Sequence, residues 1–364
     1  MRIGIDATLV RPDRLTGVER YALSLLAALA RRAPGDIVLF TRPATPPALR
    51  ALDVEQHASP FTRRVPTEQA WLPRAAREAG IELLHSLAFP TPVLWRGPAV
   101  ITIHDATPWL YPETLSTGMR YYYRPLYAQA LRRAAGVITV SNASRTDLLA
   151  TLRLDPDHVH VTRNGVAPMF FGARTPDAAR GRYLLAVGTL EPRKNLEALL
   201  DALRILRGEG RDLQLVLVGR RGWAEDLPLE GIAPYVRLTG AIPDDELIEL
   251  YAGAACFVLP SLYEGFGLSL AEAMAAGTPA VASDIAALRE VGGDTVRYAP
   301  PRDPARLAAT IGKALDDREE SAALAARARE RARAFTWDGC AAQTLELYRA
   351  LTARSGTPRR LAAP

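Results

Sequence analysis

The chain has 364 residues, 48% of them hydrophobic, and this length exceeds the size at which one hydrophobic core usually keeps growing. We therefore expect two domains. Its 45 Lys and Arg residues only slightly outnumber its 40 Asp and Glu residues and form no basic block, which argues against nucleic acid as a partner. The formal charge of +5 suits anionic ligands, an anionic membrane surface or an ordinary arginine-rich surface equally well.

The first half of the chain alternates short apolar, β-branched runs with longer helical patterns, which is typical of βα units around a parallel sheet. A helix is predicted over 18–31, because Tyr21, Leu25 and Leu29 recur at helical spacing. The predicted strands are brief and apolar, as expected when both faces of a sheet are covered: 3–5, 37–40, 83–84, 100–103 and 137–140.

Turn residues interrupt this pattern over 164–177, and a second set of βα units then begins. A last helix is predicted over 337–351, and 353–364 should form a frayed end. Two doubly wound modules that face each other would bind a ligand between the carboxyl ends of their strands. The predicted strands of the second half are 183–187, 213–218, 236–238, 255–259 and 279–282, with a helix over 195–206 among the helices between them.

The cysteines and the lengths of the apolar runs indicate in which cellular compartment the protein is expected. Cys256 lies in an apolar run typical of a buried, inert thiol, and with Cys340 as the other cysteine neither a disulfide framework nor a zinc site is predicted. Asp6 comes too early for a signal peptide, and no apolar stretch approaches the roughly 20 residues that span a bilayer. We expect a cytoplasmic protein, which could also bind peripherally to the inner face of the membrane.

The segment 260–274 carries the most specific chemistry. A strand ends at Pro260, a glycine-containing loop follows and a helix should begin near Phe266, so free backbone N–H groups and the positive helix end form an anion site. Glu264 lies in the loop and Glu272 about two turns into the helix, where both carboxylates can accept hydrogen bonds from vicinal hydroxyls. Either glutamate alone would more often be a solvated surface residue. Their combination favours a sugar joined to a ribose through a diphosphate.

This segment resembles the E-x7-E signature of retaining glycosyltransferase family 4, a family with the GT-B fold. The resemblance implies that Glu264 binds donor-sugar hydroxyls and Glu272 binds the ribose. It also implies that the backbone amides of four residues meet sugar and phosphate: Gly265, Phe266, Gly267 and Leu268.

A second match lies at 187–195, where Gly188 follows a strand and permits close approach of the backbone to a ligand. Arg193 and Lys194 can neutralise a diphosphate leaving group, as this loop does in the family. An isolated pair of this kind is usually solvated, and Asn195 is an ordinary helix N-cap residue, so the interpretation rests on the two motifs together. The stretches 218–220 and 236–240 resemble family segments that border the nucleotide base.

Two elements of the first half also match the family. His104 directly follows a strand, and the segment with Pro112 and Glu113 resembles a branch of mannosyltransferases that build lipid-linked polysaccharides. The resemblance makes His104 a contact of the donor sugar near the reaction centre, although one such histidine is more often structural. The loop containing Thr16 and Gly17 resembles the glycine loop that meets acceptor and phosphate, but it lacks the second glycine often found there.

The resemblance covers nearly the whole chain and predicts an α/β protein with two Rossmann-like domains facing across a cleft. Residues 1–170 would form the acceptor-side domain, 171–340 the domain that binds the nucleotide-sugar donor, and 341–364 a helix returning to the first domain with a frayed tail. Because cations and a helix end can stabilise the diphosphate, no metal or other cofactor is expected. Retention through front-face departure and attack is implied, without a protein nucleophile.

The predicted function is transfer of a hexose to a saccharide, with a lipid-linked saccharide as the leading acceptor, in cell-surface polysaccharide or glycolipid assembly. Guanosine diphosphate mannose is the favoured donor, from the resemblance to the mannosyltransferase branch. The alternatives are a nucleotide-sugar epimerase of the same fold and a catalytically silent nucleotide-binding homologue in a glycan-assembly complex. A dinucleotide-dependent oxidoreductase is disfavoured, because the first strand leads into Asp6 without a G-x-G-x-x-G motif.

Overall fold

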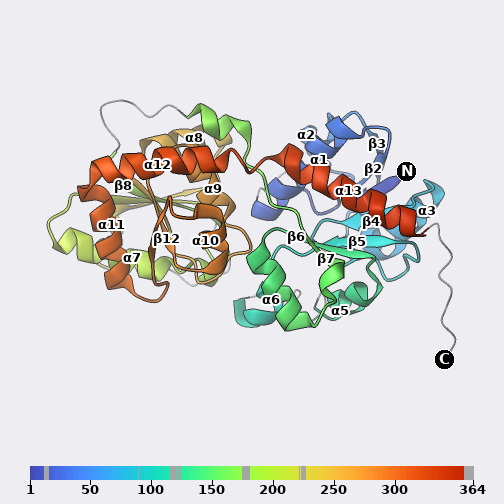
Figure 1. Ribbon diagram of the computed structural model, residues 1–364, viewed down its shortest axis with the longest axis horizontal. Helices are drawn as coiled ribbons and strands as arrows, with labels where there is room; N and C mark the ends of the chain where they lie inside the picture. The colour runs from blue at the N-terminus through green and yellow to red at the C-terminus, as the bar shows by residue number, and fades with distance from the viewer. Residues whose placement is uncertain are drawn as a thin grey trace. The chain divides into compact units, whose positions relative to one another are not determined.

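A computed structural model describes residues 1–11, 16–88, 90–114, 121, 124–173, 181–220, 222 and 227–355. The chain forms two compact units. Met1–Val140, Ser144–Gly165 and Trp337–Pro364 make up the first, and Ser141–Ala143 with Val166–Thr336 the second (Figure 1). The domain boundaries expected from the sequence, after residues 170 and 340, lie a few residues further along the chain and remain predictions.

The first unit is built on a seven-stranded parallel sheet in the order β3-β2-β1-β4-β5-β6-β7. Its strands are β1 (Ile3–Asp6), β2 (Ile37–Thr41), β3 (Glu55–Ala58), β4 (Leu83–Ser86), β5 (Ala99–Thr102), β6 (Gly136–Thr139) and β7 (Val159–Val161). The helices among its described residues are α1 (Gly17–Arg32), α2 (Pro47–Arg50), the π-helix Pro66–Trp71, α3 (Leu72–Glu78), α4 (Thr107–Leu110), α5 (Arg124–Arg133), α6 (Asn142–Leu152) and α13 (Trp337–Ser355).

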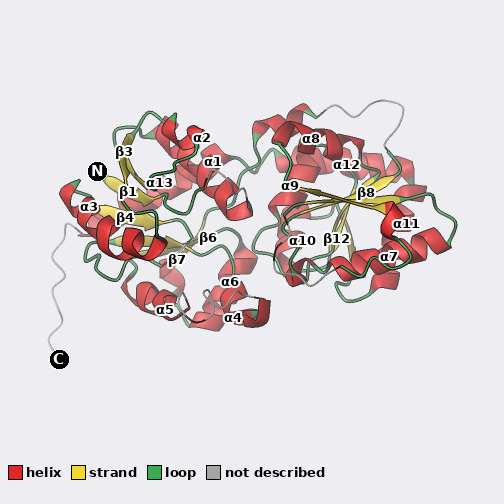
Figure 2. Ribbon diagram, turned by 180° about the vertical axis from the view of Figure 1, so that it is seen from behind, coloured by secondary structure: helices red, strands yellow, loops and turns green. Residues whose placement is uncertain are grey.

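The second unit has a six-stranded parallel sheet in the order β10-β9-β8-β11-β12-β13. Helices lie on both sides of this sheet, as Figure 2 shows, and the leucines of α7 pack into its apolar core. The strands are β8 (Tyr183–Val187), β9 (Gln214–Val218), β10 (Val236–Gly240), β11 (Cys256–Leu259), β12 (Ala280–Ser283) and β13 (Arg297–Ala299). The α-helices among the described residues of this unit are α7 (Leu196–Gly208), α8 (Asp244–Gly253), α9 (Leu268–Ala275), α10 (Ala286–Gly292), α11 (Pro304–Asp316) and α12 (Arg318–Ala332).

The last helix, α13, completes the first unit, as expected for the returning C-terminal helix, and lies beside α1 (Figure 1). Its Tyr348 hydroxyl lies 2.5 Å from Nδ1 of His85, a fully buried residue of β4. Nε2 of His85 lies 2.8 Å from Oγ1 of Thr102, which is in turn 3.1 Å from the hydroxyl of Tyr21 on α1. Because a buried polar group is costly without partners, this chain of hydrogen bonds specifies how α13 docks. The tail from residue 356 lies outside the described residues.

We expect His85 to make the protein unfold readily in acid. Burial, followed by the charge of His104, lowers the pKa of His85 to about 3 from the ordinary histidine value of 6.5. Below pH 6.5 the unfolded chain therefore binds a proton that the folded chain does not bind. The free energy of unfolding should consequently fall by about 3–5 kcal/mol between pH 6.5 and 3. Urea unfolding across this pH range should show a flatter profile for His85→Gln than for wild type. An equally steep profile for His85→Gln would contradict this assignment.

The structure confirms the strands and helices predicted from apolar periodicity to within a few residues. Three strands escaped prediction, β3, β7 and β13, because each is short and carries polar or charged residues. Cys256 and Cys340 are both buried free thiols, as expected for Cys256. Among the described residues, no helix is both long and apolar enough to cross a membrane.

Candidate active site

Two loops meet where the strand order of the second sheet reverses. The chain runs outward from β8 to β9 and β10 in one direction and from β11 to β12 and β13 in the other, so β8 and β11 flank the switch point. The loop 188–195 follows β8 and the loop 260–267 follows β11, and parallel strands put their carboxyl ends at the same edge. Ligands of open α/β sheets bind at this position, and both sequence motifs lie there.

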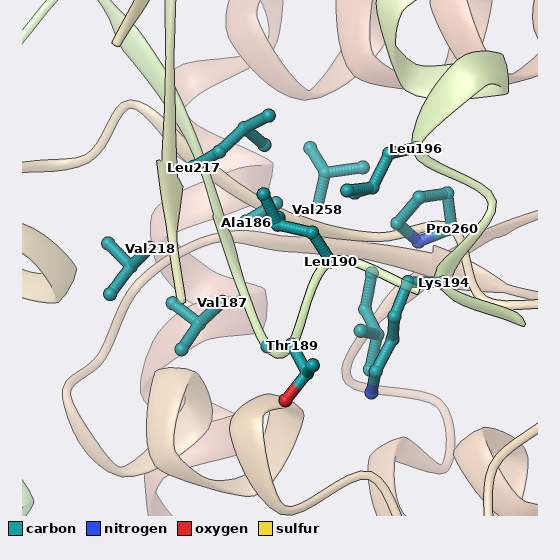
Figure 3. A pocket seen from close by; sticks show the side chains of 12 residues that line it. Ala186, Val187, Thr189, Leu190, Lys194, Leu196, Leu217, Val218, Val258 and Pro260 are labelled. Carbon is teal, nitrogen blue, oxygen red and sulfur yellow. The ribbon is translucent and has the colours of Figure 1, made fainter. Parts of the chain in front are cut away.

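A small recess opens between these strand ends (Figure 3). Its wall is mainly apolar, and the polar ends of Thr189 and Lys194 extend together to the side away from Leu217 and Val258. The Gly188 amide donates to the Val218 carbonyl at 2.9 Å, which fixes the backbone at its rim. The lining residues are Ala186, Val187, Gly188, Thr189, Leu190, Lys194, Leu196, Leu217, Val218, Val258, Leu259 and Pro260.

Glu264 binds both cations of the neighbouring loop. Its Oε1 accepts from Lys194 Nζ at 2.6 Å and from Ser261 Oγ at 2.7 Å, and its Oε2 accepts from Arg193 Nη1 at 3.1 Å. A carboxylate offers about four lone-pair positions, so one stays available on Oε2 for a ligand hydroxyl. Burial alone would raise the pKa of Glu264, but Lys194, Arg193 and these hydrogen bonds outweigh it and lower the pKa to about 2. Glu264 is therefore ionised at every pH relevant to catalysis.

Arg193 and Lys194 differ in how many hydrogen-bond donors they still have for a ligand. Arg193 also donates from Nη1 to the Tyr263 carbonyl at 2.7 Å and from Nη2 to Glu191 at 2.6 Å, so it joins the two loops. The Lys194 ammonium has three N–H donors, and its hydrogen bond to Glu264 uses one of them. The geometry therefore makes Lys194 the better donor to an anion and Arg193 the residue that holds the loops together.

Asn195 does not act as the ordinary N-cap that its position suggests. It adopts a left-handed conformation, with φ 53° and ψ 41°, and its side chain makes no capping hydrogen bond to α7. Instead, Nδ2 donates to the carbonyl oxygens of Pro260 and Pro301. The prediction of a capping role was wrong because a sequence does not show that the loop after β11 offers nearby carbonyls.

The second glutamate lies on the helix that follows the loop. Glu272 is buried, with 4% of its surface exposed, and its Oε2 accepts from the Tyr251 hydroxyl at 3.1 Å. Because α9 begins at Leu268, Glu272 lies little more than one turn into the helix, not two as predicted. The shorter distance keeps its carboxylate near the helix start.

Backbone at the start of α9 has the form expected of an anion site. Gly267 precedes the helix with φ 92°, and a Cβ there would come within 2.4 Å of Leu288. Its carbonyl accepts from the amides of Leu270 and Ala271, so the amides before them point beyond the helix end. The Phe266 side chain is buried edge-on against Phe335, with ring centroids 5.5 Å apart, so at Phe266 the backbone alone can meet a ligand.

His104 lies in the first unit, two residues after the end of β5 at Thr102. Its Nε2 donates to the Leu87 carbonyl at 3.0 Å, which leaves Nδ1 as an acceptor in the neutral ring. The ring also stands edge-on to Tyr21, with centroids 4.6 Å apart. Burial lowers the pKa of His104, and the hydrogen bond to Leu87 and the charge of Asp105 only partly oppose it. A neutral, firmly held imidazole results.

Thr16 and Gly17 lie at the start of α1 in the first unit. The Thr16 amide and hydroxyl both donate to Glu19, which forms a capping box with the N-cap residue. This local role of Glu19 follows from its position three residues after Thr16. A Cβ at Gly17 would meet no atom within 4 Å, so the space beside it is open. The preceding residues 12–15 lie outside the described residues.

These features define a glycosyltransferase with the GT-B fold, and comparisons give its family. The model of Glycosyltransferase Family 4 matches residues 15–169, and that of Glycosyl transferases group 1 matches 174–331. The O-antigen chain mannosyltransferase B of Escherichia coli is 31% identical over 373 residues, covering 93% of this chain and 97% of that protein. The chain belongs to glycosyltransferase family 4, whose members retain the anomeric configuration and use a nucleotide-sugar donor without a required metal.

Further relatives agree with this family. The MMP alpha-(1->4)-mannosyltransferase of Mycolicibacterium hassiacum is 37% identical over 242 residues, covering 64% of this chain and 58% of that protein. The structure of sucrose-phosphate synthase from Thermosynechococcus elongatus superposes with a TM-score of 0.76 at 24% identity, over 97% of this chain and all of that one, which supports the fold alone. In the part of the chain that the structure describes, no three His, Cys, Asp or Glu side chains gather to hold a metal ion.

Proposed function

We propose that the chain transfers mannose from guanosine diphosphate mannose to a saccharide carried on a lipid, in the assembly of a cell-surface polysaccharide or glycolipid. The observation that carries the donor site is the contact of Glu264 with Lys194 and Arg193 at the switch point of the second sheet. The relatives named as mannosyltransferases support mannose as the transferred sugar.

The role proposed for each donor-site residue follows from the hydrogen-bonding groups that the residue offers to a ligand. Lys194 and the backbone from Gly265 to Leu268 stabilise the departing diphosphate, because an ammonium group and a helix N-terminus both attract an anion. Glu264 accepts a hydroxyl of the donor sugar through its remaining lone pair, and Glu272 accepts from the ribose. Gly188 lets the diphosphate approach the backbone.

The remaining roles concern the sugar and the acceptor. His104 accepts a hydrogen bond from the donor sugar through Nδ1, since its Nε2 proton is held by Leu87. Thr16 and Gly17 meet the acceptor, because Gly17 faces open space. The leaving phosphate takes the acceptor proton as the new bond forms on the face from which it departs, so no protein nucleophile is required.

Glu272→Gln tests the donor site directly. We expect it to weaken binding of guanosine diphosphate about tenfold, because a carboxyl group with two oxygens becomes an amide whose nitrogen can only donate, and the ribose hydroxyls lose one acceptor. Isothermal titration without metal, with uridine diphosphate and adenosine diphosphate as competitors for base preference, measures this. Glu290→Gln on α10 serves as the matched control and should leave affinity unchanged.

Two results would contradict the proposal. Equal affinity of wild type and Glu272→Gln would remove the ribose role of Glu272, and absence of binding to any nucleotide diphosphate would remove the donor site itself. Binding without transfer of mannose to any saccharide would favour the catalytically silent homologue.

A further inference from the structure

Asn195 connects three loops of the second unit. It directly follows Lys194, and its side-chain nitrogen donates to the carbonyl of Pro260 at 3.0 Å and to the carbonyl of Pro301. Pro260 begins the loop after β11 that carries Glu264, and Pro301 lies two residues after the end of β13. The side-chain amide has two N–H groups, and these two carbonyls use both of them. Asn195 therefore joins the loop after β8 to the loops after β11 and β13.

The backbone of Asn195 lies in the left-handed region, with φ 53° and ψ 41°. In the described part of the chain, Arg153 is the one other non-glycine residue with a positive φ. A Cβ usually makes this conformation costly, and glycine adopts it without that cost. Glycine has no side-chain donor, however, whereas asparagine combines tolerance of this conformation with two N–H groups. The conformation and the bridge between the loops together explain an asparagine at this position.

The conformation at Asn195 also affects the path of the preceding side chain. A short 3-10 helix, Pro192–Lys194, ends at Asn195, and the chain then enters α7. The Lys194 side chain passes over Gly188, where a Cβ would lie 3.1 Å from Lys194 Cε. From there its Nζ reaches Glu264 at 2.6 Å, at the recess between the two strand ends (Figure 3). A change in chain direction at Asn195 would therefore move the ammonium away from Glu264.

Other hydrogen bonds between the loops after β8 and β11 involve the residue before Lys194. The Arg193 carbonyl accepts from the Leu262 amide at 2.9 Å, and Arg193 Nη1 donates to the Tyr263 carbonyl at 2.7 Å. These contacts hold the chain on one side of Lys194, and the bridge from Asn195 holds it on the other. Both sides are needed to fix the backbone from which the Lys194 side chain extends.

We infer that Asn195 is a positioning residue, which joins the three loops and so keeps the Lys194 ammonium where it meets both Glu264 and the diphosphate of the donor. The inference rests on the proposed function, in which Lys194 binds that diphosphate. Asn195 acts through Lys194 and not by contact with the substrate.

Asn195→Gly is the decisive variant, because glycine adopts the left-handed conformation but removes the bridge, without adding a charge. We expect it to raise the Kd for guanosine diphosphate about tenfold, since the ammonium loses its fixed position beside the diphosphate. Isothermal titration without metal measures this. Arg153→Gly is the matched control: it places glycine at the other left-handed residue, which is exposed and lies in the first unit, and it should leave the Kd unchanged.

The same substitution in a Lys194→Gln background tests whether Asn195 acts through Lys194. If it does, Asn195→Gly should change the Kd less than about twofold once the ammonium is gone. An equal loss of affinity in both backgrounds would overturn the inference, and so would an Asn195→Gly protein that binds as tightly as wild type. A Lys194→Gln protein with the affinity of wild type would instead remove the proposed role of Lys194, so failure of that role and failure of this inference give different results.

Discussion

Lys194→Gln should lower kcat/KM for mannose transfer by about 10²–10³-fold, or about 3–4 kcal/mol of transition-state stabilisation. The ammonium lies 2.6 Å from Glu264 at the mouth of the recess between β8 and β11, and it retains donors for the departing diphosphate. Because Arg193 is already engaged by Glu191, Glu264 and a carbonyl, it cannot replace the missing donors. A radiolabelled-donor assay with saturating acceptor measures the effect.

The chain provides an unusually clean control, because its sequence contains two lysines, Lys194 and Lys313. Lys313 is 66% exposed on α11, so Lys313→Gln should retain the activity of the wild type. Breaking a buried ion pair also costs stability, so thermal unfolding must show that Lys194→Gln is folded at the assay temperature. A folded Lys194→Gln protein with kcat/KM within about threefold of wild type would exclude Lys194 from the reaction.

Gly219→Ala should lower the free energy of unfolding by about 2–4 kcal/mol and weaken guanosine diphosphate binding at least tenfold. A Cβ at Gly219 would lie 1.9 Å from the Gly188 carbonyl oxygen, and the φ of 145° already disfavours any other residue. Relief of this clash must move the loop after β8, which carries Gly188 and Lys194. Urea unfolding and isothermal titration measure the two effects.

Gly208→Ala is the matched control for this substitution. Gly208 ends α7, and a Cβ there would meet no atom within 4 Å, so the variant should be as stable as wild type or more stable by up to about 1 kcal/mol. If Gly219→Ala bound the nucleotide as tightly as Gly208→Ala does, the strand-end backbone would not form part of the donor site.

The sequence predicted the fold well where apolar periodicity was strong, as in α1 and β8. It also located both loops of the candidate site, because glycines and charged residues directly follow predicted strands there. It could not reveal that Glu264 is already bonded to Lys194, Arg193 and Ser261, since such contacts depend on the order of strands in the sheet.

The docking of α13 on the first unit sets an order for folding during synthesis. The first unit buries His85 against Tyr348, so its hydrogen bonds are completed only after almost the whole chain has left the ribosome. Most of the second unit, Val166–Thr336, is continuous in sequence and emerges before α13. The second unit can therefore form its own core first, whereas the core of the first unit is completed only when α13 docks.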